Sequence, residues 1–294
     1  MKKKSVSIRK AVIPAAGFGT RFLPQTKAMP KEMLPIVDKP VIQYVVEEIV
    51  ESGITDIVMI TGWHKRSIED HFDYPYELEQ RLKEAGKEKE LSEVRRIANM
   101  ANFIYVRQKG PYGNATPVMC ARNVVGNEPF AVLWGDEFIH ANPPRLKQMI
   151  DVYEKYGSPV ISGVRIKSKK DLARYGIAEV KHIEDNVYQV LQIIEKPDPN
   201  RAPSNLAAHG AYILPPEIFP IIENLKPGKG GELWLPDAID QLIKIEKVLV
   251  CEIDNAHYYD TGNKFEYLRT VIDLALKHPE INGQLKDYLK SLKL

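Results

Sequence analysis

The stretch AVIPAAGFGTRFLP, residues 11–24, decides the fold expected for this chain. It begins as a short apolar run, typical of a buried strand, and continues into a segment rich in glycine and proline. Apolar positions then recur at helical spacing over residues 41–50. Glycines at the end of a strand let backbone N–H groups close around phosphate oxygens. The order of strand, long loop and helix therefore predicts an anion site in an α/β protein.

Strands and helices continue to alternate as far as residue 166. The expected strands are 56–61, 103–107, 130–134 and 159–166, with a helix at 64–71 and one or two charged surface helices within 76–101. Such alternation predicts a doubly wound, mainly parallel Rossmann-like sheet covered on both faces. Beyond it, short strands at 176–180, 187–194 and 207–214 predict a smaller mixed or antiparallel sheet, followed by helices at 233–245 and 264–278 around a strand at 248–253.

Composition and charge exclude several classes of protein. The formal net charge is +2 and the basic residues are dispersed, which argues against a nucleic-acid partner. No apolar stretch approaches the roughly 20 residues of a membrane span. Cys120 and Cys251 lack the spacing of a zinc site and are expected to be small core residues in a reducing cytosol. The prediction is a cytoplasmic protein without membrane or nucleic-acid partners.

The glycine-rich loop fits a triphosphate better than two other phosphate motifs. A dinucleotide fingerprint needs a small residue where Phe22 stands and a helix directly afterwards, but Pro24 and Pro30 interrupt this segment. A P-loop needs a Gly-Lys-Ser or Gly-Lys-Thr ending, which is absent here. Arg21 and Lys31 instead bring positive charge to the same loop.

Several motifs together resemble the signature of the sugar-1-phosphate nucleotidyltransferases. They are GFGTRFLP (residues 17–24), PKEMLP (30–35), DKP (38–40), EKP (195–197) and YDTGNK (259–264). Their order and spacing are similar to those of the bacterial UTP–glucose-1-phosphate uridylyltransferase branch. The resemblance implies the nucleotide-diphospho-sugar transferase fold. It also implies one domain over 9–294 after a basic tail at 1–8, with nucleotide-binding (9–166), sugar-binding (167–262) and C-terminal helical (263–294) parts.

The resemblance also implies a role for each candidate site residue. The nucleotide would be bound by Ala15, Ala16, Gly17, Gly19, Thr20, Glu32, Gln108 and Gly113. The sugar would be bound by Tyr175, Gly176 and Glu195, while Arg21, Lys31 and Lys196 would act on the phosphates. Asp136 and Asp260 would be ligands of Mg²⁺, which prefers one or two carboxylates together with substrate phosphates.

The reaction implied by the resemblance is transfer of the uridylyl group of UTP to glucose-1-phosphate, giving UDP-glucose and pyrophosphate in a homo-oligomer, a dimer or a tetramer. Residues 112–117 and 232–237 and the segment His209 to Tyr212 differ from the usual pattern of this branch near the base and sugar pockets. Two alternatives follow, namely dTTP or another hexose-1-phosphate as the substrate, and a catalytically silent nucleotide-binding paralogue.

Overall fold

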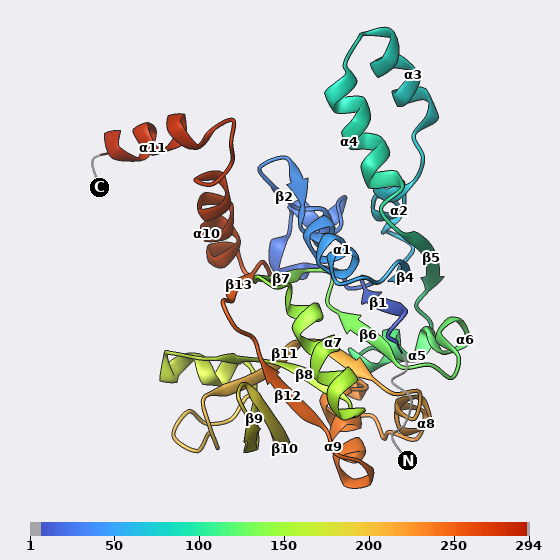
Figure 1. Cartoon of the computed structure of the whole chain (residues 1–294), viewed down its shortest axis with the longest axis vertical. Coiled ribbons are helices and arrows are strands. Elements are labelled where there is room, and N and C mark those ends of the chain that lie inside the picture. The colour runs from blue at the N-terminus through green and yellow to red at the C-terminus, as the bar shows by residue number, and fades with distance from the viewer. Residues whose placement is uncertain (1–6, 293–294) are drawn as a thin grey trace.

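One mixed, nine-stranded sheet forms the centre of the molecule in the computed structural model, which describes residues 7–292 (Figure 1). Most of the predicted basic tail, including Lys2 to Lys4, lies outside the described residues. The strand order is β5-β4-β1-β6-β11-β8-β12-β10-β9. The first four of these strands are parallel to one another, as expected of a doubly wound sheet.

The bounds of the elements follow the chain in order. The strands are Lys10–Pro14 (β1), Pro35–Ile36 (β2), Lys39–Pro40 (β3), Asp56–Thr61 (β4), Asn102–Arg107 (β5), Phe130–Leu133 (β6), Glu137–His140 (β7), Val160–Arg165 (β8), Gly176–Glu184 (β9), Val187–Glu195 (β10), Leu206–Leu214 (β11), Leu249–Glu252 (β12) and His257–Asp260 (β13). The α-helices are Val41–Glu51 (α1), Arg66–Phe72 (α2), Tyr76–Glu84 (α3), Glu88–Ala98 (α4), Ala115–Cys120 (α5), Arg122–Val125 (α6), Arg145–Tyr156 (α7), Ile218–Glu223 (α8), Leu235–Ile245 (α9), Lys264–Ala275 (α10) and Asn282–Ser291 (α11).

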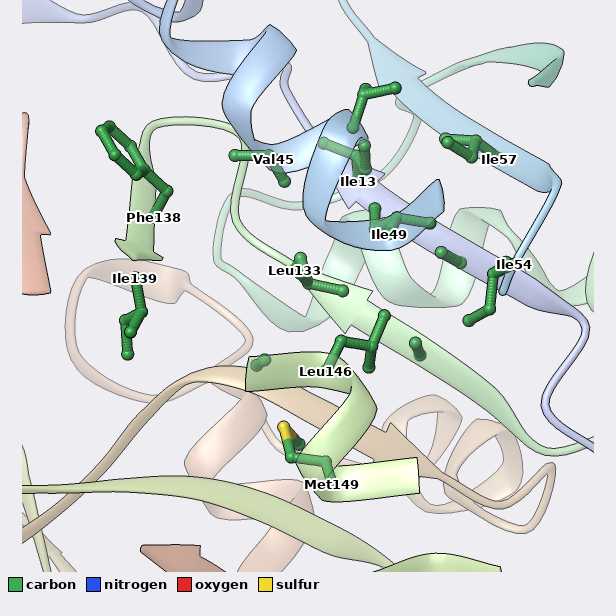
Figure 2. Packing of buried hydrophobic residues seen from close by; sticks show 14 of the residues in the cluster. Ile13, Val45, Ile49, Ile54, Ile57, Leu133, Phe138, Ile139, Leu146 and Met149 are labelled. Carbon is green, nitrogen blue, oxygen red and sulfur yellow. The ribbon is translucent and has the colours of Figure 1, made fainter. Parts of the chain in front are cut away.

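The two faces of the sheet are covered by different helices, because successive side chains of a strand point to opposite faces. Ile13 of β1 and Leu133 of β6 pack with α1 and α7 on one face (Figure 2). Val12 and Val132, their neighbours in sequence, pack with α5, α8 and α9 on the other face. This alternation confirms the predicted α/β fold with helices on both faces.

The smaller sheet expected after residue 166, predicted to be grafted onto the first, is continuous with it. Strand β11 pairs with β6 on one side and with β8 on the other, so the later strands extend the same sheet. Ala207 of β11 also pairs with Ile177 of β9, which brings the far edge of the sheet back to β11. A chain-order pattern of turns and strands predicts local hairpins such as β9-β10, but it does not show that β11 lies antiparallel between β6 and β8.

Several helices were not predicted from sequence, and α7 is one of them. Residues 145–156 form α7, which begins after Pro144 and ends at Gly157 in a left-handed conformation. Its apolar positions do have helical spacing. A buried ion pair fixes it to α1, because the Arg145 guanidinium donates two hydrogen bonds of 2.9 Å to the Glu48 carboxylate.

Of the two cysteines expected to be core residues, Cys251 is buried, whereas Cys120 is only partly buried.

Candidate active site

The glycine-rich loop follows β1 and holds five of the candidate residues, Ala15, Ala16, Gly17, Gly19 and Thr20, close together. The backbone N–H of Ala15 donates to the Ile60 carbonyl at 2.9 Å, which keeps the start of the loop in line with β4. Gly19 has a left-handed φ of 66° and its carbonyl accepts a hydrogen bond of 2.7 Å from the Thr26 hydroxyl. The loop therefore folds back on itself, and no α-helix begins directly after it, as expected.

Lys31 and Asp136 form an ion pair at the mouth of this loop. Asp136 follows β6 at its carboxyl end, where ligands of open α/β sheets gather. Burial by itself raises the pKa of the Asp136 carboxyl, but Lys31 and, to a smaller extent, Arg21 bring that pKa below its ordinary value. The Asp136 carboxylate is therefore ionised at neutral pH and is available to a cation.

The Glu32 side chain is paired with Lys65 in this structure. Its carboxylate accepts a hydrogen bond of 2.7 Å from the Lys65 ammonium, and both side chains are 1% exposed. In this structure the Glu32 carboxylate therefore faces Lys65 beneath the loop and is not presented to a base or a ribose. Its predicted direct contact with the nucleotide stays a prediction that this arrangement does not favour.

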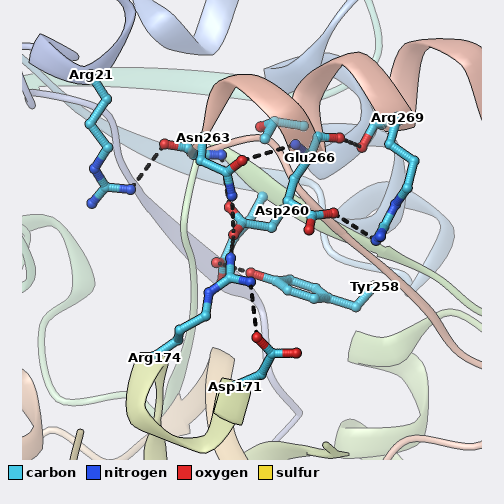
Figure 3. A network of polar contacts seen from close by, with 12 residues as sticks. Arg21, Asp171, Arg174, Tyr258, Asp260, Asn263, Glu266 and Arg269 are labelled. Carbon is cyan, nitrogen blue, oxygen red and sulfur yellow. Dashed lines mark hydrogen bonds and ion pairs between the residues drawn. The ribbon is translucent and has the colours of Figure 1, made fainter. Parts of the chain in front are cut away.

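Asp260 lies at the centre of a second polar network (Figure 3). Arg174 donates to its carboxylate at 2.6 Å, and the backbone N–H of Gly262 donates at 2.8 Å. Asn263 donates to the same carboxylate at 3.3 Å and caps the first turn of α10 by accepting from the Glu266 N–H. The carboxylate is thus oriented by three donors.

The two predicted metal ligands are brought to neighbouring positions by the pairing of β7 with β13. Asp260 is opposite Glu137, the residue that directly follows Asp136. The Thr261 hydroxyl donates to the Asp136 carbonyl, and Arg21 donates to the Gly262 carbonyl at 3.0 Å. The pairing and these hydrogen bonds join residues that are separated by more than a hundred positions in sequence.

Two adjoining cavities, of about 550 and 280 Å³, lie between the glycine-rich loop and β9–β10. Both are lined by Arg21, Glu137, Arg174, Tyr175 and Lys196. The larger one also reaches Asp260 and Asn263, and the smaller one also reaches Gly176, Glu195, Tyr212 and Trp234. The arrangement places positive charge on both sides of a space large enough for a phosphorylated sugar.

The three predicted sugar-binding residues and Lys196 meet where β9 begins and β10 ends. Gly176 is opposite Glu195, and a Cβ on Gly176 would lie 3.0 Å from the Glu195 carboxylate. Lys196 has a φ of 47°, and its backbone N–H donates to the Tyr175 carbonyl at 3.1 Å. Burial raises the pKa of Tyr175 to about 12, so its phenol stays protonated and can donate a hydrogen bond.

The two predicted base-side residues, Gln108 and Gly113, lie in the segment after β5 and are not among the residues that line these cavities, although Asn114, next to Gly113, lines the smaller one. The backbone N–H of Gln108 donates to the Thr61 carbonyl at 2.9 Å, which continues the pairing of β5 with β4. Gly113 has a φ of 124°, and residues 112–115 are bonded to Leu233 through the Tyr112 carbonyl and the Ala115 N–H. The structure therefore joins the segments 112–117 and 232–237, both of which depart from the usual pattern of the branch.

The close approach at Gly113 gives a prediction. A Cβ there would lie 2.1 Å from the Leu233 carbonyl oxygen, so Gly113→Ala has to separate the two segments. We expect a lower midpoint of thermal unfolding and weakened nucleotide handling, measured by calorimetry and by steady-state kinetics. Gly53→Ala is the matched control, because Gly53 has a φ of 91°, which also disfavours a side chain, but nothing lies within 4 Å of its Cβ position. Equal effects of the two substitutions would mean that backbone strain alone matters at Gly113.

Sequence reasoning missed several residues that line the cavities. Glu137 accepts a hydrogen bond of 3.0 Å from the Tyr258 hydroxyl, and Arg174 holds Asp260. Both were adjacent in sequence to assigned residues, Asp136 and Tyr175. Their position next to an assigned residue could have identified them as site residues. A charged residue next to a site residue is, however, more often solvated than functional.

Comparison with known proteins agrees with this geometry. A family model described as "Nucleotidyl transferase" matches residues 10–275. A UTP--glucose-1-phosphate uridylyltransferase of Bacillus subtilis is 49% identical over 285 residues, which is 97% of each chain. One from Staphylococcus epidermidis is 47% identical over 98% of this chain and 99% of its own.

Solved structures give the same result. A UTP-bound UGPase from Acinetobacter baumannii superposes with a TM-score of 0.90 at 37% identity, covering 97% of this chain and all of the other. A UDP-glucose pyrophosphorylase complexed with UDP-glucose gives a TM-score of 0.84 at 39% identity, covering 92% of this chain and all of the other. Because the family model covers most of the chain and the relatives match it nearly from end to end, this chain belongs to the nucleotidyl transferase family.

Proposed function

We propose that this protein transfers the uridylyl group of UTP to glucose-1-phosphate and releases pyrophosphate. The observation that carries the proposal is the placement of two cationic groups on opposite sides of one space. Arg21, from the glycine-rich loop, and Lys196, from the end of β10, line the same two cavities. The names of the relatives and the nucleotides in the solved structures support UTP and a glucose-phosphate as the substrates.

The proposed reaction is an in-line attack by a phosphate oxygen of the sugar-1-phosphate on the α-phosphorus of UTP. The attacking phosphate is already anionic near neutral pH, so a general base is not required. Rate acceleration then depends on holding two mutually repelling anions together and on neutralising charge. In this proposal Arg21 and Lys31 bind the triphosphate, Lys196 binds the sugar phosphate, and Glu195 orients the sugar by accepting hydrogen bonds from its hydroxyls.

Asp136 and Asp260 are suited to hold Mg²⁺. No cluster of three or more His, Cys, Asp or Glu side chains with metal-site geometry occurs among residues 7–292, but Mg²⁺ is commonly bound by one or two carboxylates and substrate phosphates. Each of the two carboxylates is held by a cation, Lys31 or Arg174, that phosphate oxygens could also attract. When bound, Mg²⁺ would supply charge neutralisation between the two substrates.

A pyrophosphate-release assay tests the proposal. UTP, dTTP, ATP and GTP are each paired with glucose-1-phosphate, galactose-1-phosphate and N-acetylglucosamine-1-phosphate, with and without a chelator. We expect UTP with glucose-1-phosphate to give the highest kcat/KM. A tenfold preference for another sugar would overturn the sugar assignment alone, and no release with any pair would overturn the proposed activity.

The two basic sides of the cavity are expected to behave differently on substitution. Arg21→Ala should raise the KM for UTP and lower kcat, whereas Lys196→Ala should mainly raise the KM for glucose-1-phosphate. Each lost contact in a preorganised site is worth about 3 kcal/mol, on the order of a hundredfold. Lys181→Ala, an exposed lysine of β9, is the control and should leave both constants unchanged. Equal small effects on both substrates would contradict these positions.

The protein is also proposed to form a homo-oligomer, a dimer or a tetramer. Helix α11 buries none of its side chains and extends away from the sheet (Figure 1). Phe265 and Leu268 of α10 and Tyr288 of α11 are exposed apolar side chains, such as subunit interfaces often cover. Light scattering during gel filtration measures the oligomeric state, and a monomer would contradict the proposal.

None of the helices within residues 7–292 combines the length and the hydropathy needed to cross a membrane. The cytoplasmic location stays a prediction.

A further inference from the structure

The Lys65–Glu32 ion pair beneath the glycine-rich loop has no assigned role in the proposed reaction. Lys65 precedes α2, and Glu32 lies in the short 3-10 helix Lys31–Met33. Their charged groups are 2.7 Å apart, and each side chain is 1% exposed. A fully buried lysine and glutamate lose their hydration and are stabilised little by pairing alone. Such a pair is therefore better explained by a requirement for position than by one for stability.

The pair belongs to a row of alternating charges that ends at the triphosphate site. Lys65 is bonded to Glu32, and Lys31, the next residue to Glu32 in the chain, is paired with Asp136. Burial lowers the pKa of the Lys31 ammonium, but Asp136 and Glu32 both raise it, and the net shift is upward. Lys31 is therefore attracted by two carboxylates, only one of which faces the site.

The Glu32 side chain also lies close to the backbone that carries Asp136. A Cβ on Gly135, the residue before Asp136, would lie 3.4 Å from Cγ of Glu32 and 3.2 Å from Ile13. Glu32 is therefore next to Lys31 in the chain and close to the residue that precedes Asp136, so it adjoins both members of the Lys31–Asp136 pair.

We infer that Lys65 is a positioning residue: it occupies the Glu32 carboxylate and thereby leaves the Lys31 ammonium for Asp136 and the triphosphate. This inference rests on the proposed function, because it assigns Lys31 to the triphosphate. Burial raises the pKa of the Glu32 carboxyl, and Lys31 and Lys65 are the two cations that lower it. Without Lys65, Lys31 is the cation that remains to pair with Glu32, and it is drawn away from Asp136. Glu32 would then act through Lys31 and not by direct contact with the nucleotide.

The inference predicts that a second substitution rescues the first. Lys65→Met leaves Glu32 unpaired, and we expect kcat/KM for UTP to fall about 10- to 100-fold, as is usual for groups that orient a ligand-binding residue. The double variant Lys65→Met with Glu32→Gln removes both charges and should recover most of this loss. Lys65→Arg keeps a cation beside Glu32 and should lose less than Lys65→Met. The KM for glucose-1-phosphate should change little in any of them.

Inorganic triphosphate binding, measured by calorimetry on the same variants, separates this inference from the proposed function. Binding weakened by Lys65→Met and restored in the double variant supports the positioning role even if the wild type releases no pyrophosphate from UTP. Thermal unfolding midpoints are recorded in parallel to show that each variant is folded at the assay temperature. Wild-type triphosphate binding in Lys65→Met, or a double variant as weak as the single one, would overturn the inference.

Discussion

Replacing Asp136 by Asn should abolish nucleotidyl transfer while the protein keeps its fold. The Asp136 carboxylate is ionised, is one quarter exposed, and lies at the end of β6 between Lys31 and the segment Asp260 to Gly262. An amide of the same shape keeps the packing but loses the negative charge that a divalent cation requires. Since electrostatic stabilisation of the transition state usually contributes more to catalysis than any other effect, we expect kcat to fall by at least about 10³-fold.

Pyrophosphate release measures this result, and circular dichroism shows whether the fold is kept. Asp70→Asn is the matched control, because Asp70 is an exposed aspartate whose partner, Arg66, lies 3.5 Å away on the surface of α2. It should leave turnover unchanged. In the wild type, a chelator should stop turnover and added Mg²⁺ should restore it. Full activity of Asp136→Asn would exclude this residue as a ligand.

Replacing Lys31 by Met should have an effect of similar size and should also change the pH profile. The substitution removes the ammonium assigned to the triphosphate, and a loss of about 10²- to 10³-fold in kcat/KM for UTP is expected. Burial by itself raises the pKa of Asp136, and Lys31 is the main group that brings it below the ordinary 3.8. Without Lys31, that pKa should rise.

The sign of the pH effect follows from the charge that Asp136 needs. The carboxylate is active when ionised, so raising its pKa moves the acid limb of the pH–rate profile to higher pH. Lys31→Met should therefore recover part of its activity as the pH increases, whereas the wild type should show no acid limb from Asp136 near neutrality. The profile of kcat/KM for UTP measures this shift. An unchanged acid limb would mean that Lys31 does not control this carboxylate.

The Arg21 loop illustrates what local sequence could predict and what it could not. Glycine after an apolar run and the prolines that follow are local signals, and they correctly predicted a strand followed by a loop; phosphate binding by this loop stays a prediction. The same signals did not reveal that Arg21 donates to Gly262, because the contact joins residues 241 positions apart. Likewise, nothing near Glu32 in sequence indicates that Lys65 covers its carboxylate.

Sequence by itself determined the nine strands of the large sheet and the chemical types of the site residues. Periodicity and turn residues depend on the few positions around each strand or helix, so β4 was predicted with its observed bounds, and α1 nearly so. The tertiary structure alone decided that β11 lies between β6 and β8 in the sheet, that β7 and β13 bring Asp260 next to Asp136, and that Glu32 is buried. These depend on which distant strands pair, and pairing is set by the packing of the whole chain rather than by any local segment.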